Sequence, residues 1–248
     1  MNYDSSESYD DNYEQESQHI DIMALISEVD PSVATKAEFP GPEDGESGET
    51  SMCEWGGIPN TLRMNMLDTH NTRRELLALG QFTDNKGVTL PAAAKMNYLE
   101  WNCTLEKEAY EFLKSCPTEG YQRPNGNLPA QNFYRGVITE AEPTFRDMNK
   151  KTVTEWWKKG RKVNGPGKDL YFLLEHNSTE IKSFTLMGWG STTQIGCSIA
   201  KCDDNWVEAC RYYPPGNESD EQMYTPGRAC SQCASLGKIC HNQKGLCK

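Results

Sequence analysis

Ten cysteines are the residues of this chain with the widest choice of chemistry, because thiols form disulfides, bind zinc or act as nucleophiles. The last four fall within the final nineteen residues, and the Cys230-x2-Cys233 spacing fits a four-cysteine zinc site as well as two disulfides. The spacing does not decide between these, but an even count together with glycosylation sequons indicates an oxidising, secretory route, so we predict disulfides throughout and no free catalytic thiol. The ten residues are Cys53, Cys103, Cys116, Cys197, Cys202, Cys210, Cys230, Cys233, Cys240 and Cys247.

Three Asn-x-Ser/Thr sequons offer sites for N-glycosylation, at Asn102, Asn177 and Asn217, and none has proline in the middle position. Sequons combined with an even set of cysteines predict a secreted, extracellular protein. Residues 1–19 lack the apolar run of a signal peptide, so we interpret the sequence as a mature form. No apolar run approaches the roughly 20 residues that a membrane span needs.

The acidic charge of the chain is concentrated near its start. Residues 1–52 carry fourteen Asp or Glu and one Lys, whereas the remainder carries 22 acidic and 24 basic residues. Apolar residues are too few in 1–52 to bury a core, which predicts disorder, apart from one short amphipathic helix over 20–29. Tyr3, Tyr9 and Tyr13 lie among these acids as candidate sulfation sites; the alternative is a solubilising spacer. No basic patch or reading motif indicates nucleic-acid binding.

The elements that would position these residues follow from apolar periodicity. Helices are predicted over 65–79, 99–114 and 152–162, and a loop rich in Pro, Gly and Asn over 116–132. Strands are predicted over 184–189, 195–201 and 206–213. Helices followed by strands indicate an α+β fold. We divide the chain into the acidic segment 1–52, a domain over 53–213 and a cysteine-rich extension over 214–248, which has too little apolar mass to fold without staples.

Four segments, in order, carry a family resemblance. The run LDTHNTRR over 67–74 resembles a His-Asn-x-x-Arg opening, and 96–116 resembles a helix that lies between two cysteines. The run SFTLMGW over 183–189 and the run CRYYPPGN over 210–217 are similar to two further motifs. Together they resemble the CAP superfamily (the cysteine-rich secretory, antigen 5 and pathogenesis-related group), in the style of nematode activation-associated and venom allergen-like members.

The resemblance implies a disulfide-stapled three-layer α-β-α sandwich with a central antiparallel sheet. It also implies a central cleft in which many members hold a divalent metal on two His and two Glu. Here the matching positions carry Gln131, Lys159 and Ser183, and no His lies between His70 and His176 to supply the fourth ligand. An amide and a hydroxyl are poor ligands and a lysine repels a cation, so we predict no metal site and no cofactor.

The remaining candidate residues point away from catalysis. The resemblance makes His70 a structural residue of the first helix, whereas His176, beside a sequon, is expected to be exposed. Trp156, Trp157, Phe184 and Trp189 are expected in the core. No Gly-x-Ser-x-Gly elbow is present. We therefore predict that the protein is not an enzyme.

Among binding roles, the resemblance favours a parasite effector that engages a host protein or cell-surface receptor, as in immune modulation. One alternative is an extracellular sterol or fatty-acid carrier, because family members bind lipids. Another alternative is a protease inhibitor, with an inhibitory loop in the cysteine-rich end.

Overall fold

The computed structural model describes residues 36–41, 51–55, 57–121, 123, 127–139, 141, 143–162, 165–241 and 244–248. The chain divides into two units, Met1–Ala34 and Thr35–Lys248, and all described residues belong to the second. The three candidate sulfotyrosines and the predicted helix over 20–29 lie outside the described residues.

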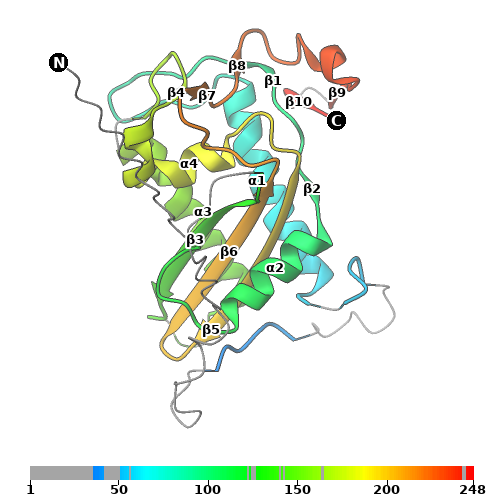
Figure 1. The fold of residues 1–248 in the computed structure, drawn as a ribbon, viewed down its shortest axis with the longest axis vertical. Coiled ribbons are helices and arrows are strands. Elements are labelled where there is room, and N and C mark those ends of the chain that lie inside the picture. The colour runs from blue at the N-terminus through cyan, green and yellow to red at the C-terminus, as the bar shows by residue number, and fades with distance from the viewer. Residues whose placement is uncertain are drawn as a thin grey trace, which may run out of the picture. The chain divides into compact units, whose positions relative to one another are not determined.

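A four-stranded sheet forms the centre of the second unit, with the strand order β2-β5-β6-β3 (Figure 1). Its long strands β3 (Ala130–Val137), β5 (Gln194–Cys202) and β6 (Asn205–Tyr213) pair antiparallel, in agreement with the prediction. The short strand β2 (Glu100–Trp101) instead runs parallel to β5, because the chain reaches it by a crossover rather than by a hairpin.

Helices cover both faces of this sheet and make the predicted three layers. Figure 1 shows α2 (Cys103–Leu113) on one face of β5 and β6, and α1 (Asn60–Ala78), α3 (Phe145–Lys162) and α4 (Ile181–Met187) on the other. The larger hydrophobic core fills the space between the sheet and the three-helix layer. The α+β sandwich predicted from the sequence is confirmed.

The start and the packing of α2 are both written in its sequence. Asn102 caps the helix, since its Oδ1 accepts hydrogen bonds from the backbone amides of Thr104 and Leu105 at 2.9 and 3.1 Å. The helix lies close against β5 because Gly196 has no side chain there. A Cβ at that position would collide with the backbone of Asn102 and Glu106.

The strand predicted over 184–189 is wrong, because Phe184 to Met187 belong to helix α4. Helix α4 packs against α3, α1 and β3, and every residue from Phe184 to Met187 is buried, so this stretch shows no helical periodicity. A short continuous apolar run does not distinguish a buried helix from a buried strand.

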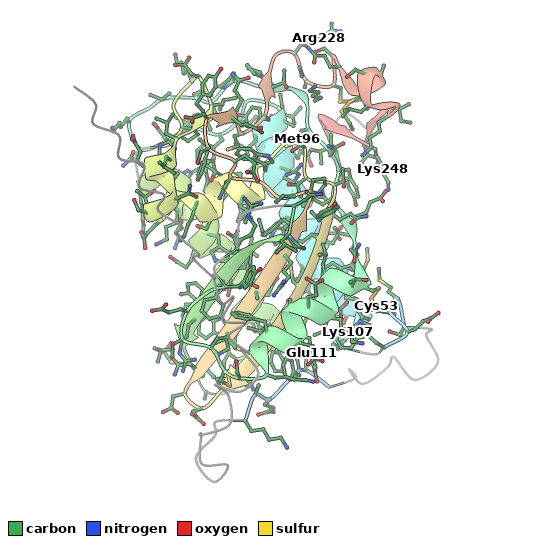
Figure 2. All side chains as sticks on the ribbon, in the orientation of Figure 1. Cys53, Met96, Lys107, Glu111, Arg228 and Lys248 are labelled. Carbon is green, nitrogen blue, oxygen red and sulfur yellow. A yellow bond between two sulfur atoms is a disulfide. The ribbon has the colours of Figure 1, made fainter. Side chains whose placement is uncertain are left out.

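The cysteine-rich extension is held by disulfides and by pairing with the start of the domain. It contains β7 (Glu221–Gln222), β8 (Thr225–Pro226), the 3-10 helix η3 (Cys233–Leu236), β9 (Cys240–His241) and β10 (Leu246–Cys247). Strand β8 pairs with β1 (Ala93–Lys95), and β7 pairs with β4 (Tyr171–Phe172). The Cys247 amide donates to the Met96 carbonyl at 2.7 Å. Figure 2 shows Arg228 and Lys248 of the extension far from Cys53 and Glu111.

All ten cysteines form disulfides, which confirms that prediction and decides against zinc for the last four. Three bridges tie the domain and two tie the extension: Cys53–Cys103, Cys116–Cys202, Cys197–Cys210, Cys230–Cys240 and Cys233–Cys247. Model-dependent estimates give each such bridge a stabilisation of roughly 2–4 kcal/mol.

Part of the acidic segment lies on the domain. The backbones of Glu38 and Lys201 exchange two hydrogen bonds, at 2.9 and 2.8 Å, and Phe39 packs against Tyr110 with ring centroids 3.9 Å apart. Residues 36–41 therefore extend the edge of the sheet beside β5. Among the described residues, no helix is long and apolar enough to cross a membrane.

Candidate functional site

A polar cleft of about 660 Å³ lies where β3, α4 and the segment after β6 meet, and it contains two of the sequence-predicted positions. Gln131 comes from β3 and Ser183 from α4, while the loop after α2 and the segment 216–219 complete the walls. Strand β3 alternates, so Asn132, next to Gln131, points into the core.

Gln131 has unused hydrogen-bonding capacity in this cleft, as does Arg123 at its Nη1. The Nε2 and Oε1 of Gln131 are both buried, and neither has a partner among the described residues. Burying an amide without partners costs free energy, so a polar group of a ligand or a water would be favoured here.

Lys159 and Ser183 are already engaged. Lys159 Nζ pairs with Glu180 Oε1 at 2.6 Å, and this pair lies outside the residues that line the cleft. The Ser183 hydroxyl donates to the Glu180 carbonyl at 3.1 Å, within its own helix. The Lys159 ammonium is paired with a carboxylate, so it has no lone pair to offer a metal, and the Ser183 hydroxyl is hydrogen-bonded to the backbone. The absence of a metal site stays our prediction.

The described lining of the cleft carries one carboxylate and no imidazole. That carboxylate, Glu218, is bound by Arg123 Nη2 at 2.8 Å across the cleft. General acid–base catalysis needs a titratable group free to exchange a proton with a substrate. This described lining can bind polar molecules, but it supplies no carboxylate or imidazole that is free to exchange a proton.

Beneath the cleft, a buried chain of polar groups fixes its floor. Asn132 Nδ2 donates to the Ser183 carbonyl at 2.9 Å and to the Tyr212 hydroxyl at 3.3 Å. Tyr212 lies 2.9 Å from His70 Nε2, and His70 Nδ1 lies 2.8 Å from the Met66 carbonyl. These roles fit a neutral imidazole with its proton on Nδ1, because the Met66 carbonyl only accepts.

Burial lowers the pKa of His70 to about 4, supported by the nearby Arg74 and Arg73 and opposed by the hydrogen bond to the Met66 carbonyl, which raises the pKa. The imidazole is therefore uncharged at neutral pH, and the structural role expected for His70 is confirmed by its burial and its two hydrogen bonds.

His176 was expected to be exposed, and this prediction is wrong. The residue is 8% exposed, its ring packs on Phe172 at 5.4 Å, and its Nδ1 accepts the Leu173 amide at 2.9 Å. The sequon predicts that Asn177 is exposed, as it is, but it says nothing about the exposure of His176. The two side chains point in different directions on the 3-10 turn.

Sequence reasoning missed a buried ion pair between α1 and α2. Arg63 Nε and Nη2 bind Glu106 Oε2 and Oε1 at 2.7 and 2.8 Å, and both side chains are at most 1% exposed. Trp101 Nε1 also donates to this carboxylate at 2.7 Å. Neither residue stands out in sequence, because helical Arg and Glu are usually solvated.

Glu106 also lies near Cys53 and Cys103, a grouping that could suggest a metal site. The two sulfurs are bonded to each other, so neither is a thiolate able to bind zinc. The carboxylate is committed to Arg63.

The four aromatic side chains expected in the core, Trp156, Trp157, Phe184 and Trp189, are at most 4% exposed, as predicted.

The three sequons differ in what their amides already do. Asn177 is exposed at the rim of the cleft, where its Nδ2 makes one long hydrogen bond of 3.4 Å to the Ser219 hydroxyl. Asn217 Nδ2 donates to the Lys182 carbonyl at 2.7 Å while its Oδ1 accepts from Thr185 at 2.8 Å. Asn102, the helix cap, also donates to Gln194 at 2.9 Å. Asn177 is thus the sequon best placed to carry a glycan.

Comparison with known proteins gives one family over the whole core. The model of the CAP, or cysteine-rich secretory protein, family matches residues 67–213. The "Ancylostoma secreted protein" of Ancylostoma caninum is 30% identical over 196 residues, covering 77% of this chain and 45% of that protein. "Venom allergen 5.02" of Dolichovespula maculata is 28% identical over 172 residues, covering 68% and 78%. This chain therefore spans less than half of the Ancylostoma relative.

Solved structures agree. The structure of BmVAL-1 matches with a TM-score of 0.73 at 26% identity, covering 79% of this chain and 98% of that one. The crystal structure of NaASP2 with Zn2+ matches with a TM-score of 0.71 at 26% identity, covering 79% and 100%. The zinc belongs to NaASP2.

Proposed function

The chain belongs to the CAP family of cysteine-rich secretory proteins, and on that premise we propose that it is a secreted, non-enzymatic binding protein that engages a host protein or a host-cell receptor. The observation that carries the proposal is the cleft, whose described lining offers a bound Glu218 and hydrogen-bonding amides but no acid–base pair. A parasite relative, the Ancylostoma secreted protein, supports the host setting.

The outer face of α3 is the surface best suited to such a partner. The helix carries seven cationic and two acidic side chains over eighteen residues, while Met148, Val153, Trp156 and Trp157 bury its inner face. Helix α3 therefore has a net charge of +5, whereas residues 53–248 together carry +2, and this concentration of charge was not predicted from the sequence.

Part of this cationic charge has no partner in the part of the chain that the structure describes. Lys158 pairs with Glu155 and Lys159 with Glu180. Arg146, Lys150 and Lys162 are exposed and have no hydrogen-bond or ion-pair partner among the described residues. A cationic face attracts an anionic surface and raises the rate at which the two associate. This attraction weakens as the salt concentration rises. The proposed partner accordingly presents an acidic patch.

The test compares two double variants that change charge equally. Lys150→Glu/Lys162→Glu lowers the charge of the α3 face by four units, and Lys107→Glu/Lys244→Glu makes the same change at two exposed lysines elsewhere. Binding to a panel of host blood cells is measured by flow cytometry at two salt concentrations. We expect the first variant to lose binding about tenfold or more and the control to stay within about twofold.

Equal binding by both variants would remove α3 from the proposal, and wild-type protein that binds no host cell or host protein would overturn the proposal itself. The non-enzymatic part is tested with a panel of peptide and ester substrates. Turnover that survives repurification and is abolished by a substitution in the cleft would contradict it.

A further inference from the structure

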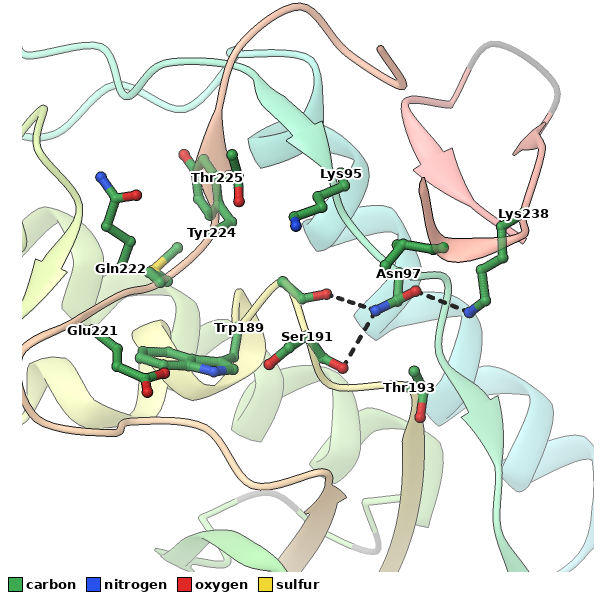
Figure 3. A pocket seen from close by; sticks show the side chains of 13 residues that line it. Lys95, Asn97, Trp189, Ser191, Thr193, Glu221, Gln222, Tyr224, Thr225 and Lys238 are labelled. Atoms are coloured by element: carbon green, nitrogen blue, oxygen red, sulfur yellow. Dashed lines mark hydrogen bonds between the residues drawn. The ribbon is translucent and has the colours of Figure 1, made fainter. Parts of the chain in front are cut away.

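We propose that a second pocket, between the loop after α4 and the cysteine-rich extension, binds a small organic anion with a flat apolar body. This proposal goes beyond the partner-binding role and uses none of the α3 residues. The pocket has a volume of about 490 Å³, which is in the range of small-molecule sites. Figure 3 shows its lining, to which β1, the 189–193 loop, β7, β8 and η3 contribute.

Two cations give the pocket its preference for an anion. Lys238 Nζ donates to Asn97 Oδ1 at 2.9 Å, so its position is fixed but its charge remains. Lys95 has no hydrogen-bond or ion-pair partner among the described residues. Figure 3 shows it extending from β1 toward Tyr224, away from Lys238. The one acidic side chain in the lining, Glu221, is exposed and leaves a net charge of one positive unit.

Further donors converge on the same space. Trp189 Nε1 and the hydroxyls of Ser191 and Thr225 make no hydrogen bond to any described residue. The two backbone carbonyls of the loop that could compete, those of Gly190 and Ser191, already accept from Asn97 Nδ2, at 3.0 and 3.3 Å. An anionic head group could therefore accept several hydrogen bonds, and contacts of a charged acceptor are stronger than neutral ones.

The rest of the wall is apolar and flat. Trp189, Met223 and Tyr224 are at most 3% exposed, and Leu236 closes the side formed by the extension. Tyr224 is held by its hydroxyl, which donates to the Pro91 carbonyl at 2.9 Å. Indole and phenol rings bury aromatic ligands well, so the favoured ligand joins an aromatic or short aliphatic body to a carboxylate or sulfonate.

Hydrogen bonds and a disulfide within the protein hold the walls of this pocket in place. On the side of the extension, the amides of Gly227 and Gln232 donate to the Ala92 and Ala94 carbonyls at 2.8 and 2.9 Å. The disulfide Cys233–Cys247 fixes the first residue of η3. A wall held by hydrogen bonds and a covalent bond costs little conformational entropy on binding.

Two fluorescent probes that differ in one group test the proposal on the full chain. The first is 8-anilinonaphthalene-1-sulfonate, and the second is N-phenyl-1-naphthylamine, which lacks the sulfonate. Each is titrated by fluorescence and by calorimetry into wild type, Lys95→Gln and the control Lys244→Gln, a lysine outside the pocket. Circular dichroism confirms that all three chains are folded to the same Tm.

We expect one sulfonate probe per chain, at least tenfold weaker binding in Lys95→Gln, and less than twofold change in Lys244→Gln. The uncharged probe should bind wild type and Lys95→Gln alike. A second variant, Ser191→Trp, should weaken both probes by blocking the mouth of the pocket. Absence of binding to wild type, equal weakening by the control, or no effect of Lys95→Gln would each overturn the proposal, whatever the α3 variants do.

Discussion

The imidazole of His70 and the phenol of Tyr212 share a hydrogen bond of 2.9 Å although 142 residues separate them in the chain. The bond joins α1 to β6 at the centre of the core, under the polar cleft. Both residues are fully buried, so each would be left with an unpaired polar group if the other were removed.

Tyr212→Phe should lower the free energy of unfolding by about 1–3 kcal/mol, because it strips a partner from His70 Nε2 and from Asn132 Nδ2 without leaving a large cavity. Urea denaturation measures the loss. Tyr213→Phe is the control: its hydroxyl accepts one exposed hydrogen bond from Asn127 and should change stability by less than about 0.5 kcal/mol. A loss as large in the control would contradict the role given to the buried bond.

Glu208 should make stability fall as pH rises. Burial raises the pKa of its carboxyl from 4.5 to about 7, against the smaller opposing effect of hydrogen bonds from Asn149 and Thr152. Between these two pH values the folded protein keeps a proton that the unfolded chain has lost. The contribution is therefore complete below pH 4.5 and is lost as pH rises to about 7.

Glu208→Gln removes that titration and keeps the shape of the side chain. Relative to wild type, the variant should gain up to about 3 kcal/mol between pH 5 and pH 8. Denaturation at several pH values gives the difference, and His70 does not disturb it because it titrates in both chains. Glu108→Gln, whose carboxylate pairs with Arg211 near the surface, should show no such gain, and parallel curves for wild type and Glu208→Gln would refute the assignment.

Glu106→Gln should destabilise the protein by about 3–5 kcal/mol, because Arg63 would keep its charge in a site that is at most 1% exposed. Thermal and chemical denaturation measure the effect. The exposed pair of Lys114 with Glu111 is the comparison, since Glu111→Gln should cost no more than about 1 kcal/mol. Similar losses at the two sites would mean that the Arg63 charge is relieved by water.

Glycopeptide mass spectrometry of protein made in a eukaryotic secretory host should find a glycan on Asn177, whereas Asn217 should be largely bare. The Asn217 amide already donates to the Lys182 carbonyl, and the Asn177 side chain is exposed. Asn177→Gln should then remove most of the glycan mass. A fully occupied Asn217 in the folded, secreted protein would run against this prediction.

The sequence predicted the fold well where periodicity was strong. Helices α1, α2 and α3 and strands β5 and β6 lie near where the apolar pattern puts them, although α1 begins at Asn60 rather than at 65, and α2 begins at Cys103 rather than at 99 because strand β2 precedes it. Helix α3 begins at Phe145 rather than at 152. Its first turns carry mostly polar residues, so they show no apolar stripe. Helix α4 was missed for a different reason, because its residues from Phe184 to Met187 are all buried and form a short run without a stripe.

The sites were predicted less completely than the fold. The resemblance to the family motifs placed Gln131, Lys159 and Ser183 at a central cleft, and the structure brings Gln131 and Ser183 to one cleft but leaves Lys159 outside its lining. The pocket beside Lys95 could not be predicted, since residues from 95 to 238 reach it and no local pattern records that meeting. The burial of Arg63 with Glu106 was hidden for the same reason.

Two independent features fix the register of the β5–β6 hairpin. Cys197 lies directly opposite Cys210, and a two-residue turn joins Cys202 to Asn205 at the end of the same ladder. The two-residue turn specifies this pairing through its length, and the disulfide specifies the same pairing through a covalent bond. If one of these two features is lost, the other still fixes the register. The strands that support the cleft therefore keep their pairing after a single change of this kind.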